Sequence, residues 1–532
     1  MRFSKKEIIF LGLLILVSIL VVVWIYPDFS SVGTDGAINA LIGKNIVEGQ
    51  GFSLFGEPHL IFPPLLPILI AFFFRLTSNL ELSAHLSVIS FALLSIPLFY
   101  LLVRELFSEK VAAISTAFLG FNGTIVWSYS TFVNPGILVA SFLLASILIL
   151  LKTDKNIEAG KLDKIGLAFF ILGVFIGLAY LARPEFFFLF PILMFFMFFN
   201  YYRIFQWGKL ILILSMFLAG FLIVSLPYIC FLHNNLGYWT ISGKTNGLAL
   251  LFTEVKNSEE LERPVGNKLL TAIISPPPVN QKIAELIWSN KFFFLKSYFK
   301  NLNNIQRYTA RTFGILMLFL GLGLREFIIR RRLRELTIIL LFLTPVLVAA
   351  FGVGDPAYYT THFYPLLIIF VGLGVSSFHS EVSSLFKLNR FRSRMLLNIL
   401  MAALISYSFF PVIQGYFFLP ENYKPEEFKF LGTWMASNIS GIENEIILAR
   451  KPDVSFYSGA KWQIIPYVET YEELIRLMKV NRIKYLVADD RYFKETRPQF
   501  KELLNPLKAP KNFELIKSVD YKDMHAYLYK LK

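Results

Sequence analysis

Long apolar runs, separated by short polar and often basic segments, dominate the first four-fifths of the chain. The first run follows the basic start MRFSKK and contains about 20 apolar residues, which is long enough to span a bilayer. It exceeds a signal-peptide core and has no small-residue cleavage site, so we predict an uncleaved first span. Further apolar runs lie near residues 61–76, 82–103, 111–131, 135–151, 165–182, 184–200, 209–232, 311–329, 336–352, 361–379 and 395–418.

Basic residues gather in three of the short loops, at 152–164, 325–334 and 387–394. Short loops rich in Lys and Arg remain cytoplasmic. This predicts a multi-pass plasma-membrane protein with a cytoplasmic N-terminus and an extracytoplasmic C-terminal region. Span parity then leaves two alternatives for the short, proline-rich run 61–76. It dips in and returns, leaving eleven full spans, or one further span brings the total to thirteen.

The polar segments divide the chain into two predicted domains. Residues 1–418 form a transmembrane module with an outer loop at 27–60 and a long outer loop at 233–310. Residues 419–532 form a small extracytoplasmic α/β domain, because strand patterns alternate with the helix patterns YEELIRLMKV and TRPQFKELL. The strand patterns lie at 445–449, 483–490, 513–521 and 525–531. This domain shows no Gly-rich phosphate loop, metal cluster or catalytic triad, which favours a recognition or capping module.

The composition supports the class of polytopic α-helical membrane protein. Apolar residues make up 55% of the chain, charged residues 17%, and the mean hydropathy is +0.57. The single cysteine, Cys230, excludes an internal disulfide. The net charge of +15 is explained by basic cytoplasmic loops and a basic outer domain, so the expected partner is a lipid bilayer and not nucleic acid.

One acid stands out in the stretch SVGTDGAINALIGKNIVEGQGFS, residues 31–53. Thr34 is a predicted helix N-cap, Asp35 lies in the first turn, and Gly49 and Gly51 end the helix. The face that holds Asp35 also holds Ile38, Asn39, Ile42 and Ile46, whereas Ala37, Lys44 and Glu48 lie opposite. This pattern is typical of a helix in the headgroup plane that aims its carboxylate toward the acyl boundary. The alternative is an acid that only caps the helix.

This acid, together with "PPLLP", "LLVRELFSEKVAAISTAFL", "LARPEFFFLFPILMFF", "YYTTHFYPLLIIF" and the ending "IKYLVADD…AYLYKL", resembles the GT-C superfamily of membrane glycosyltransferases. The resemblance is greatest to the protein O-mannosyltransferase and aminoarabinose-transferase branch. It implies a transferase that takes a sugar from a polyprenyl-phosphate carrier, with Asp35 as general base. Two positions where relatives often carry further acids hold Gly36 and Asn134, so a divalent metal is possible but not indicated, and we assign no metal ligands.

The leaving phosphate of such a reaction needs a cation, and arginine binds phosphate through paired hydrogen bonds. The candidates for this role are Arg183, Arg307 and Arg311, with Lys44, His59 and His362 behind them, and Glu185, Asn39 and Asp355 as other candidate site residues. Plainer roles compete with these. Arg183 and Glu185 can pair with each other, Arg307 and Arg311 can anchor a span at the headgroups, and His362 can be a buried interface histidine.

Three functions are therefore compared. The first is an inverting glycosyltransferase that acts on an acceptor hydroxyl of a protein, lipid or glycan. The second is a transporter or flippase of lipid-linked sugars, and the third is a non-enzymatic membrane assembly subunit. The acids and most candidate cations lie in outer loops and not at mid-bilayer, which favours chemistry on one face over passage across it.

Overall fold

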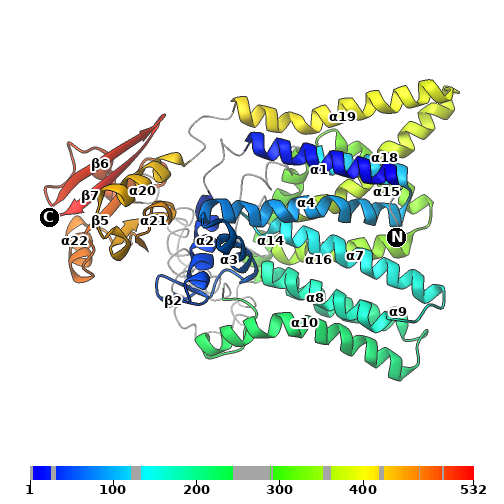
Figure 1. Ribbon diagram of the computed structural model, residues 1–532, viewed down its shortest axis with the longest axis horizontal. Helices are drawn as coiled ribbons and strands as arrows, with labels where there is room; N and C mark the ends of the chain where they lie inside the picture. Colours follow the sequence, from blue (N-terminus) through cyan, green and yellow to red (C-terminus); the bar gives the residue numbers. More distant parts are fainter. Residues whose placement is uncertain are drawn as a thin grey trace.

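The apolar runs form helices that lie side by side as a bundle, and the C-terminal sheet lies beyond one end of it (Figure 1). We call this end of the bundle the C-domain end. The computed structural model describes residues 4–25, 32–121, 133–243, 288, 291–350, 361–418, 425–466, 468–493 and 497–532. The bundle helices are α1 (Lys5–Ile25), α4 (Leu80–Leu106), α5 (Glu109–Phe121), α7 (Gly136–Glu158), α8 (Ile165–Ala182), α9 (Leu189–Tyr201), α10 (Trp207–Leu236), α15 (Leu316–Ile329), α16 (Leu333–Ala349), α18 (Tyr364–Leu385) and α19 (Arg390–Phe418).

The fold class predicted from the sequence is confirmed, although fewer helices qualify as spans than the predicted eleven to thirteen. Among the described residues, seven helices are long and apolar enough to cross a membrane, or up to eight if a bent pair counts as one span. The run 61–76 gives only the 13-residue helix α3 (Leu65–Thr77), too short to cross. The shortfall also includes α15 and α16, with 14 and 17 residues.

The predicted span 311–329 is interrupted near its start. Helix α14 (Lys291–Phe313) meets α15 at an angle of 105° around Gly314, whose φ is +48°. Only the second part of the run continues as a bundle helix. The Asn301 side chain of α14 donates to the Ala350 carbonyl at 3.0 Å, and Thr312 lies 3.3 Å from the Tyr364 hydroxyl. Helix α14 therefore contacts Ala350, which directly follows α16, and Tyr364, the first residue of α18.

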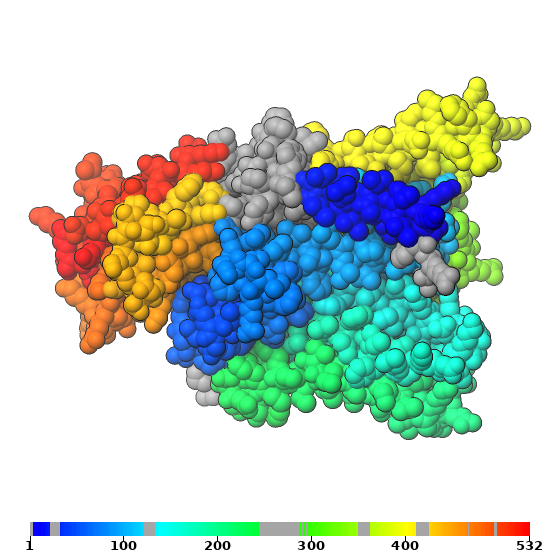
Figure 2. Space-filling view, in the orientation of Figure 1, coloured from blue at the N-terminus to red at the C-terminus, as the bar shows by residue number. Residues whose placement is uncertain are grey.

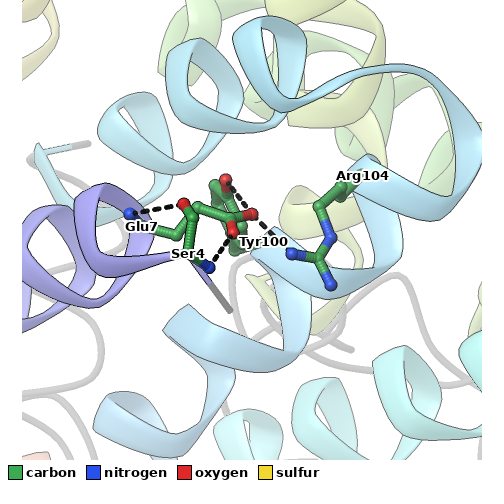
Figure 3. A network of polar contacts seen from close by, with 4 residues as sticks. All are labelled: Ser4, Glu7, Tyr100 and Arg104. Atoms are coloured by element: carbon green, nitrogen blue, oxygen red, sulfur yellow. Dashed lines mark hydrogen bonds and ion pairs between the residues drawn. The ribbon is translucent and has the colours of Figure 1, made fainter. Parts of the chain in front are cut away.

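Buried polar groups connect helices at the end of the bundle away from the C-terminal sheet. The Glu7 carboxylate of α1 accepts hydrogen bonds from the Tyr100 hydroxyl, at 2.8 Å, and from Arg104, both on α4 (Figure 3). Its other oxygen accepts from the Ser4 backbone at 2.7 Å. A charge buried at this depth is stable only when it is paired and hydrogen-bonded, so the network fixes the start of α1 on α4.

The C-terminal sheet has the order β4-β3-β5-β7-β6. Its strands are β3 (Ile446–Ala449), β4 (Lys461–Ile464), β5 (Tyr485–Asp489), β6 (Phe513–Tyr521) and β7 (Met524–Leu531). β3 pairs in parallel with β4 and β5, whereas β7 pairs antiparallel with β5 and β6. The four strand patterns predicted from the sequence are present, and β4 is an addition. The helical elements are α20 (Glu426–Asn438), α21 (Asp453–Ser458), α22 (Tyr471–Val480) and the 3-10 turns η6 (Ile442–Asn444) and η7 (Pro498–Leu504).

The C-terminal domain docks on the bundle through charged and aromatic groups. Lys429 of α20 donates to both oxygens of Glu81 in α4, at 3.0 Å each. The Tyr457 hydroxyl of α21 donates to the same carboxylate at 2.9 Å. In Figure 2 the orange residues of this domain meet the blue residues that follow α1. Phe55 contributes from the turn between β1 (Ser53–Leu54) and β2 (Glu57–Pro58), with its ring 6.5 Å from that of Trp462.

Candidate functional site at the seam between bundle and C-terminal domain

The predicted acid-bearing helix is present as α2 (Gly33–Val47), at the C-domain end of the bundle (Figure 1). The predicted helix end is confirmed, since Gly49 and Gly51 follow it with φ values of +80° and +71°. The predicted cap is wrong. The helix starts at Gly33, and the Thr34 hydroxyl instead donates to the Asp453 carboxylate of α21 at 3.2 Å. The start of α2 is therefore bonded to the C-terminal domain.

Helix α2 is enclosed by protein more fully than its amphipathic pattern predicts. Ile38, Asn39 and Ile42 are buried, as expected for one face. Ala37, predicted on the opposite face, is buried as well, so that part of the prediction is wrong. The physical reason is that α2 packs against α3, α4, β1 and α21, which cover more than one face. Protein contacts, and not a lipid surface alone, hold this helix.

Asp35 lies exposed in the first turn of α2. Within the described part of the chain its carboxylate makes no hydrogen bond or ion pair, while its backbone carbonyl accepts from the Asn39 side chain at 2.6 Å. Asn39 therefore supports the helix. A cation of the C-terminal domain, Lys451 in the segment between β3 and α21, attracts Asp35 electrostatically. Asp35 is thus an available carboxylate at the seam between the two domains.

The residue after Asp35 has no room for a side chain. A Cβ on Gly36 would lie 2.8 Å from the Val133 Cβ and 3.3 Å from the Val32 Cβ, closer than real contacts allow. Asn134, which directly follows Val133 in the chain, accepts a hydrogen bond from the Gly136 backbone at 2.8 Å and shapes the start of α7. Both positions where relatives often carry further acids therefore have a structural role in this chain.

The side chains around Asp35 also bear on whether a metal ion can bind there. Asp35 is a single carboxylate, and no group of three or more His, Cys, Asp or Glu side chains that could hold a metal ion occurs among the described residues. The described residues therefore do not fit a divalent-metal site.

Arg183, Glu185 and His362 are brought together at the C-domain end. Arg183 follows α8, and its Nε lies 2.7 Å from Glu185 Oε1 in the turn η2 (Pro184–Phe188), so these two residues pair with each other. His362, in the turn η4 (Thr361–Phe363), is buried, with its ring 5.3 Å from that of Phe186. Burial, and secondarily the Arg183 charge, hold the pKa of His362 well below its usual value. Burial therefore favours the neutral form of His362, which is the plainer role of a buried interface histidine.

Four further predicted cations differ in how available they are. Lys44 pairs with Glu48 at 3.6 Å, and His59 is buried, with Nε2 accepting from the Phe62 backbone at 3.0 Å. Arg307 and Arg311 are exposed on α14, four residues apart, and form no ion pair with any residue that the structure describes. The last pair is the most accessible of the predicted phosphate ligands. Asp355 lies outside the described residues.

The sequence reasoning missed Arg450 and Lys451, which directly follow β3. A detectable signal is present: two cations follow the buried strand pattern 445–449, and ligands of α/β sheets bind at the carboxyl ends of parallel strands. What the sequence does not give is that this strand end faces the helix of Asp35.

Comparison with solved structures identifies the fold. The chain matches ArnT from Cupriavidus metallidurans, solved with bound undecaprenyl phosphate, with a TM-score of 0.59 and 14% identity over 98% of this chain and 97% of that one. It matches the oligosaccharyltransferase AglB from Archaeoglobus fulgidus, solved with an inhibitory peptide and a dolichol-phosphate, with a TM-score of 0.59 and 15% identity over 91% of this chain and 70% of that one. The chain therefore has the fold of these two proteins, in agreement with the fold class that the sequence predicted.

A family match lies within that class. Residues 62–231 match the model of the dolichyl-phosphate-mannose-protein mannosyltransferase family. This stretch contains α3, α4, α5, α7, α8, α9 and most of α10, and so includes the two helices α3 and α4 that pack on α2. The comparison with curated proteins finds no match.

Proposed function

We propose that this chain is an inverting membrane glycosyltransferase that moves a sugar from a polyprenyl-phosphate carrier to an acceptor hydroxyl, with Asp35 as the general base. The observation that carries the proposal is the Asp35 carboxylate, exposed and unpaired at the seam of a GT-C fold. A carboxylate that only caps its own helix would be engaged by a backbone N–H, and none bonds to it.

The reaction follows from the groups present. The acceptor hydroxyl gives its proton to the Asp35 carboxylate while its oxygen forms a bond to the anomeric carbon. The bond from that carbon to the phosphate oxygen breaks, and its electron pair leaves on polyprenyl phosphate. Attack in line with the leaving group inverts the anomeric centre. A positioned base of this kind contributes about 10² to 10⁴ in rate.

The predicted membrane orientation belongs to this proposal. With the basic loops cytoplasmic, the C-domain end of the bundle is extracytoplasmic, and donor and acceptor meet there at the plasma-membrane surface. Loop positions of the candidate acids and cations agree with chemistry at that face. The acceptor is a protein, lipid or glycan hydroxyl.

For the donor phosphate, the accessible pair Arg307 and Arg311 on α14 is the first candidate, and Arg183 the second. Residues four apart on a helix share a face, so the two arginines can engage one phosphate together. We expect Arg307→Gln to weaken binding of polyprenyl phosphate, measured by ligand titration in nanodiscs. If neither Arg307→Gln nor Arg183→Gln changes that affinity, this assignment is refuted.

The function itself is tested with purified protein and a panel of synthetic polyprenyl-phosphate sugars. The proposal predicts acceptor-dependent release of polyprenyl phosphate, detected by mass spectrometry, and a product of inverted anomeric configuration by NMR. A transporter would instead move an intact lipid-linked sugar between leaflets of a vesicle and release no polyprenyl phosphate. An assembly subunit would do neither.

A further inference from the structure

Two basic residues of the C-terminal domain lie at the seam beside Asp35. Arg450 and Lys451 form the short connection between β3, which ends at Ala449, and α21, which starts at Asp453. Helix α21 packs on α2, and the Thr34–Asp453 hydrogen bond fixes their contact within two residues of Lys451. The docking of the domain therefore brings this connection to the first turn of α2.

Arg450 is buried without its hydrogen bonds. Its exposed fraction is 9%, and both Nε and Nη1 lie buried with no hydrogen-bond partner. The neighbouring Asp489 attracts the Arg450 guanidinium electrostatically, while its Oδ1 accepts from the Tyr492 backbone at 2.7 Å. Burial lowers the pKa of Arg450. A buried charged donor without a hydrogen-bond partner destabilises the fold, so such a group points to the binding of an anion.

Lys451 is the second cation of this pair, and it forms no ion pair within the described part of the chain. Its Nζ lies 5.1 Å from the centroid of the Tyr492 ring. Burial, and secondarily the Arg450 charge, lower its pKa, whereas Asp453 and Asp35 act in the opposite direction. Lys451 and Asp35 therefore attract each other across the seam between the two domains.

The acids around the two cations are engaged elsewhere. Glu427 pairs with Arg491 through bonds of 2.7 and 3.2 Å. Asp453 accepts the Thr34 hydroxyl, and its pKa is raised by burial. Burial likewise raises the pKa of Asp489 to about 7. The carboxyls that face Arg450 and Lys451 thus carry less negative charge than their number suggests.

We propose that Arg450 and Lys451 bind the phosphate of the lipid-linked donor from the side of the C-terminal domain, opposite the Asp35 carboxylate. This inference rests on the proposed function and gives the C-terminal domain a direct part in it. The domain is then a half of the site and not only a cap.

The chemistry of the leaving group supports this arrangement. As its bond to the sugar breaks, the phosphate changes from one negative charge to two, so two cations stabilise the product side more than the substrate side. The Arg450 guanidinium has the paired donors that match phosphate oxygens, and Lys451 adds a second positive charge.

The test measures binding and turnover separately in the full-length protein. Arg450→Gln, Arg450→Lys and Lys451→Gln are compared with Lys501→Gln, which removes an exposed charge elsewhere on the same domain. Undecaprenyl phosphate is titrated into protein in nanodiscs, with inorganic phosphate as competitor. We expect at least tenfold weaker lipid-phosphate binding for both Gln variants, a smaller loss for Arg450→Lys, and no change for Lys501→Gln. Competition by inorganic phosphate identifies the phosphate, and not the lipid chain, as the bound group.

The outcomes separate this inference from the proposed function. If the Gln variants bind undecaprenyl phosphate as the wild type does, the phosphate assignment is overturned while the role of Asp35 stands. If instead only the KM for the acceptor rises, the cations serve the acceptor and the assignment is also overturned. If the wild-type protein binds the lipid phosphate through these residues and yet transfers no sugar, the proposed function fails and the phosphate site remains. Should Arg450→Gln not fold, Lys451→Gln decides.

Discussion

Replacement of Gly36 by alanine tests whether the packing of α2 fixes the position of Asp35. The added Cβ would lie 2.8 Å from the Val133 Cβ, so one of the two segments must move. Overpacking of a tight contact costs about 1–3 kcal/mol. Alanine in place of glycine inside a helix returns about 1 kcal/mol. We therefore expect Gly36→Ala to destabilise the protein by about 0–2 kcal/mol.

A matched control separates the overpacking cost from the gain in helix propensity. Gly321 lies inside α15, and a Cβ there would meet nothing within 4 Å. Gly321→Ala is thus expected to be neutral or to stabilise by up to about 1 kcal/mol, since only the propensity gain applies. The difference between the two variants isolates the overpacking cost of about 1–3 kcal/mol. Midpoints of thermal unfolding in one detergent provide the comparison.

Turnover provides the second readout of Gly36→Ala. A displaced α2 start carries Asp35 with it, and a shift of about 1 Å in a catalytic group can cost 10²-fold in rate. We expect turnover to fall about 10- to 100-fold for Gly36→Ala and to remain unchanged for Gly321→Ala. Double-mutant analysis with Val133→Gly should show coupling, because Val133 supplies the contacted atom. Equal stabilisation by both alanine variants, with wild-type turnover, would refute the packing argument.

Two further predictions concern the C-terminal domain. Glu81→Gln removes the charge that Lys429 and Tyr457 bind, so we expect docking weaker by about 1–2 kcal/mol and faster hydrogen exchange in α20 and α21. Glu105→Gln, which breaks the Lys155 pair at the other end of the bundle, should leave that exchange unchanged. Burial raises the pKa of Asp489 to about 7. Between about pH 4 and 7 the folded state therefore keeps a proton that the unfolded chain releases. Because of this difference, the Asp489 carboxyl makes the free energy of unfolding fall as pH rises through that range. Asp489→Asn should therefore flatten the pH dependence of the urea midpoint by up to about 4 kcal/mol, and parallel curves for both proteins would contradict this.

The sequence predicts the bundle well because apolar length is a strong local signal. The runs that became α4, α7, α8, α10, α18 and α19 are long enough to cross a membrane with little help from context. The 105° bend before α15 is not visible in hydropathy, because the run continues through Gly314. The local sequence pattern also fails to give the correct type of helix for TRPQFKELL. It folds as the 3-10 turn η7, with the Arg497 side chain donating to the Pro466 and Ile465 carbonyls.

The candidate site likewise contains residues that the sequence predicts and residues that it does not predict. Asp35 is identified by its local pattern and by the family resemblance. Thr34 and Asp453, by contrast, are 419 residues apart, and their hydrogen bond forms only when the C-terminal domain docks. Arg450 and Lys451 reach the seam through the same tertiary contact. Hydrophobic periodicity carries no information on contacts between segments that are distant in sequence. The sequence therefore does not predict that Arg450 and Lys451 lie at the seam.

The central claim is that Asp35 removes the acceptor proton. The most direct measurement is the turnover number of Asp35→Asn at saturating donor, together with its affinity for undecaprenyl phosphate. Asparagine keeps the size of the side chain and removes the base. We predict a loss of about 10² to 10⁴ in turnover with unchanged lipid-phosphate affinity and normal expression. Sugar transfer at the wild-type rate by this variant would contradict the account.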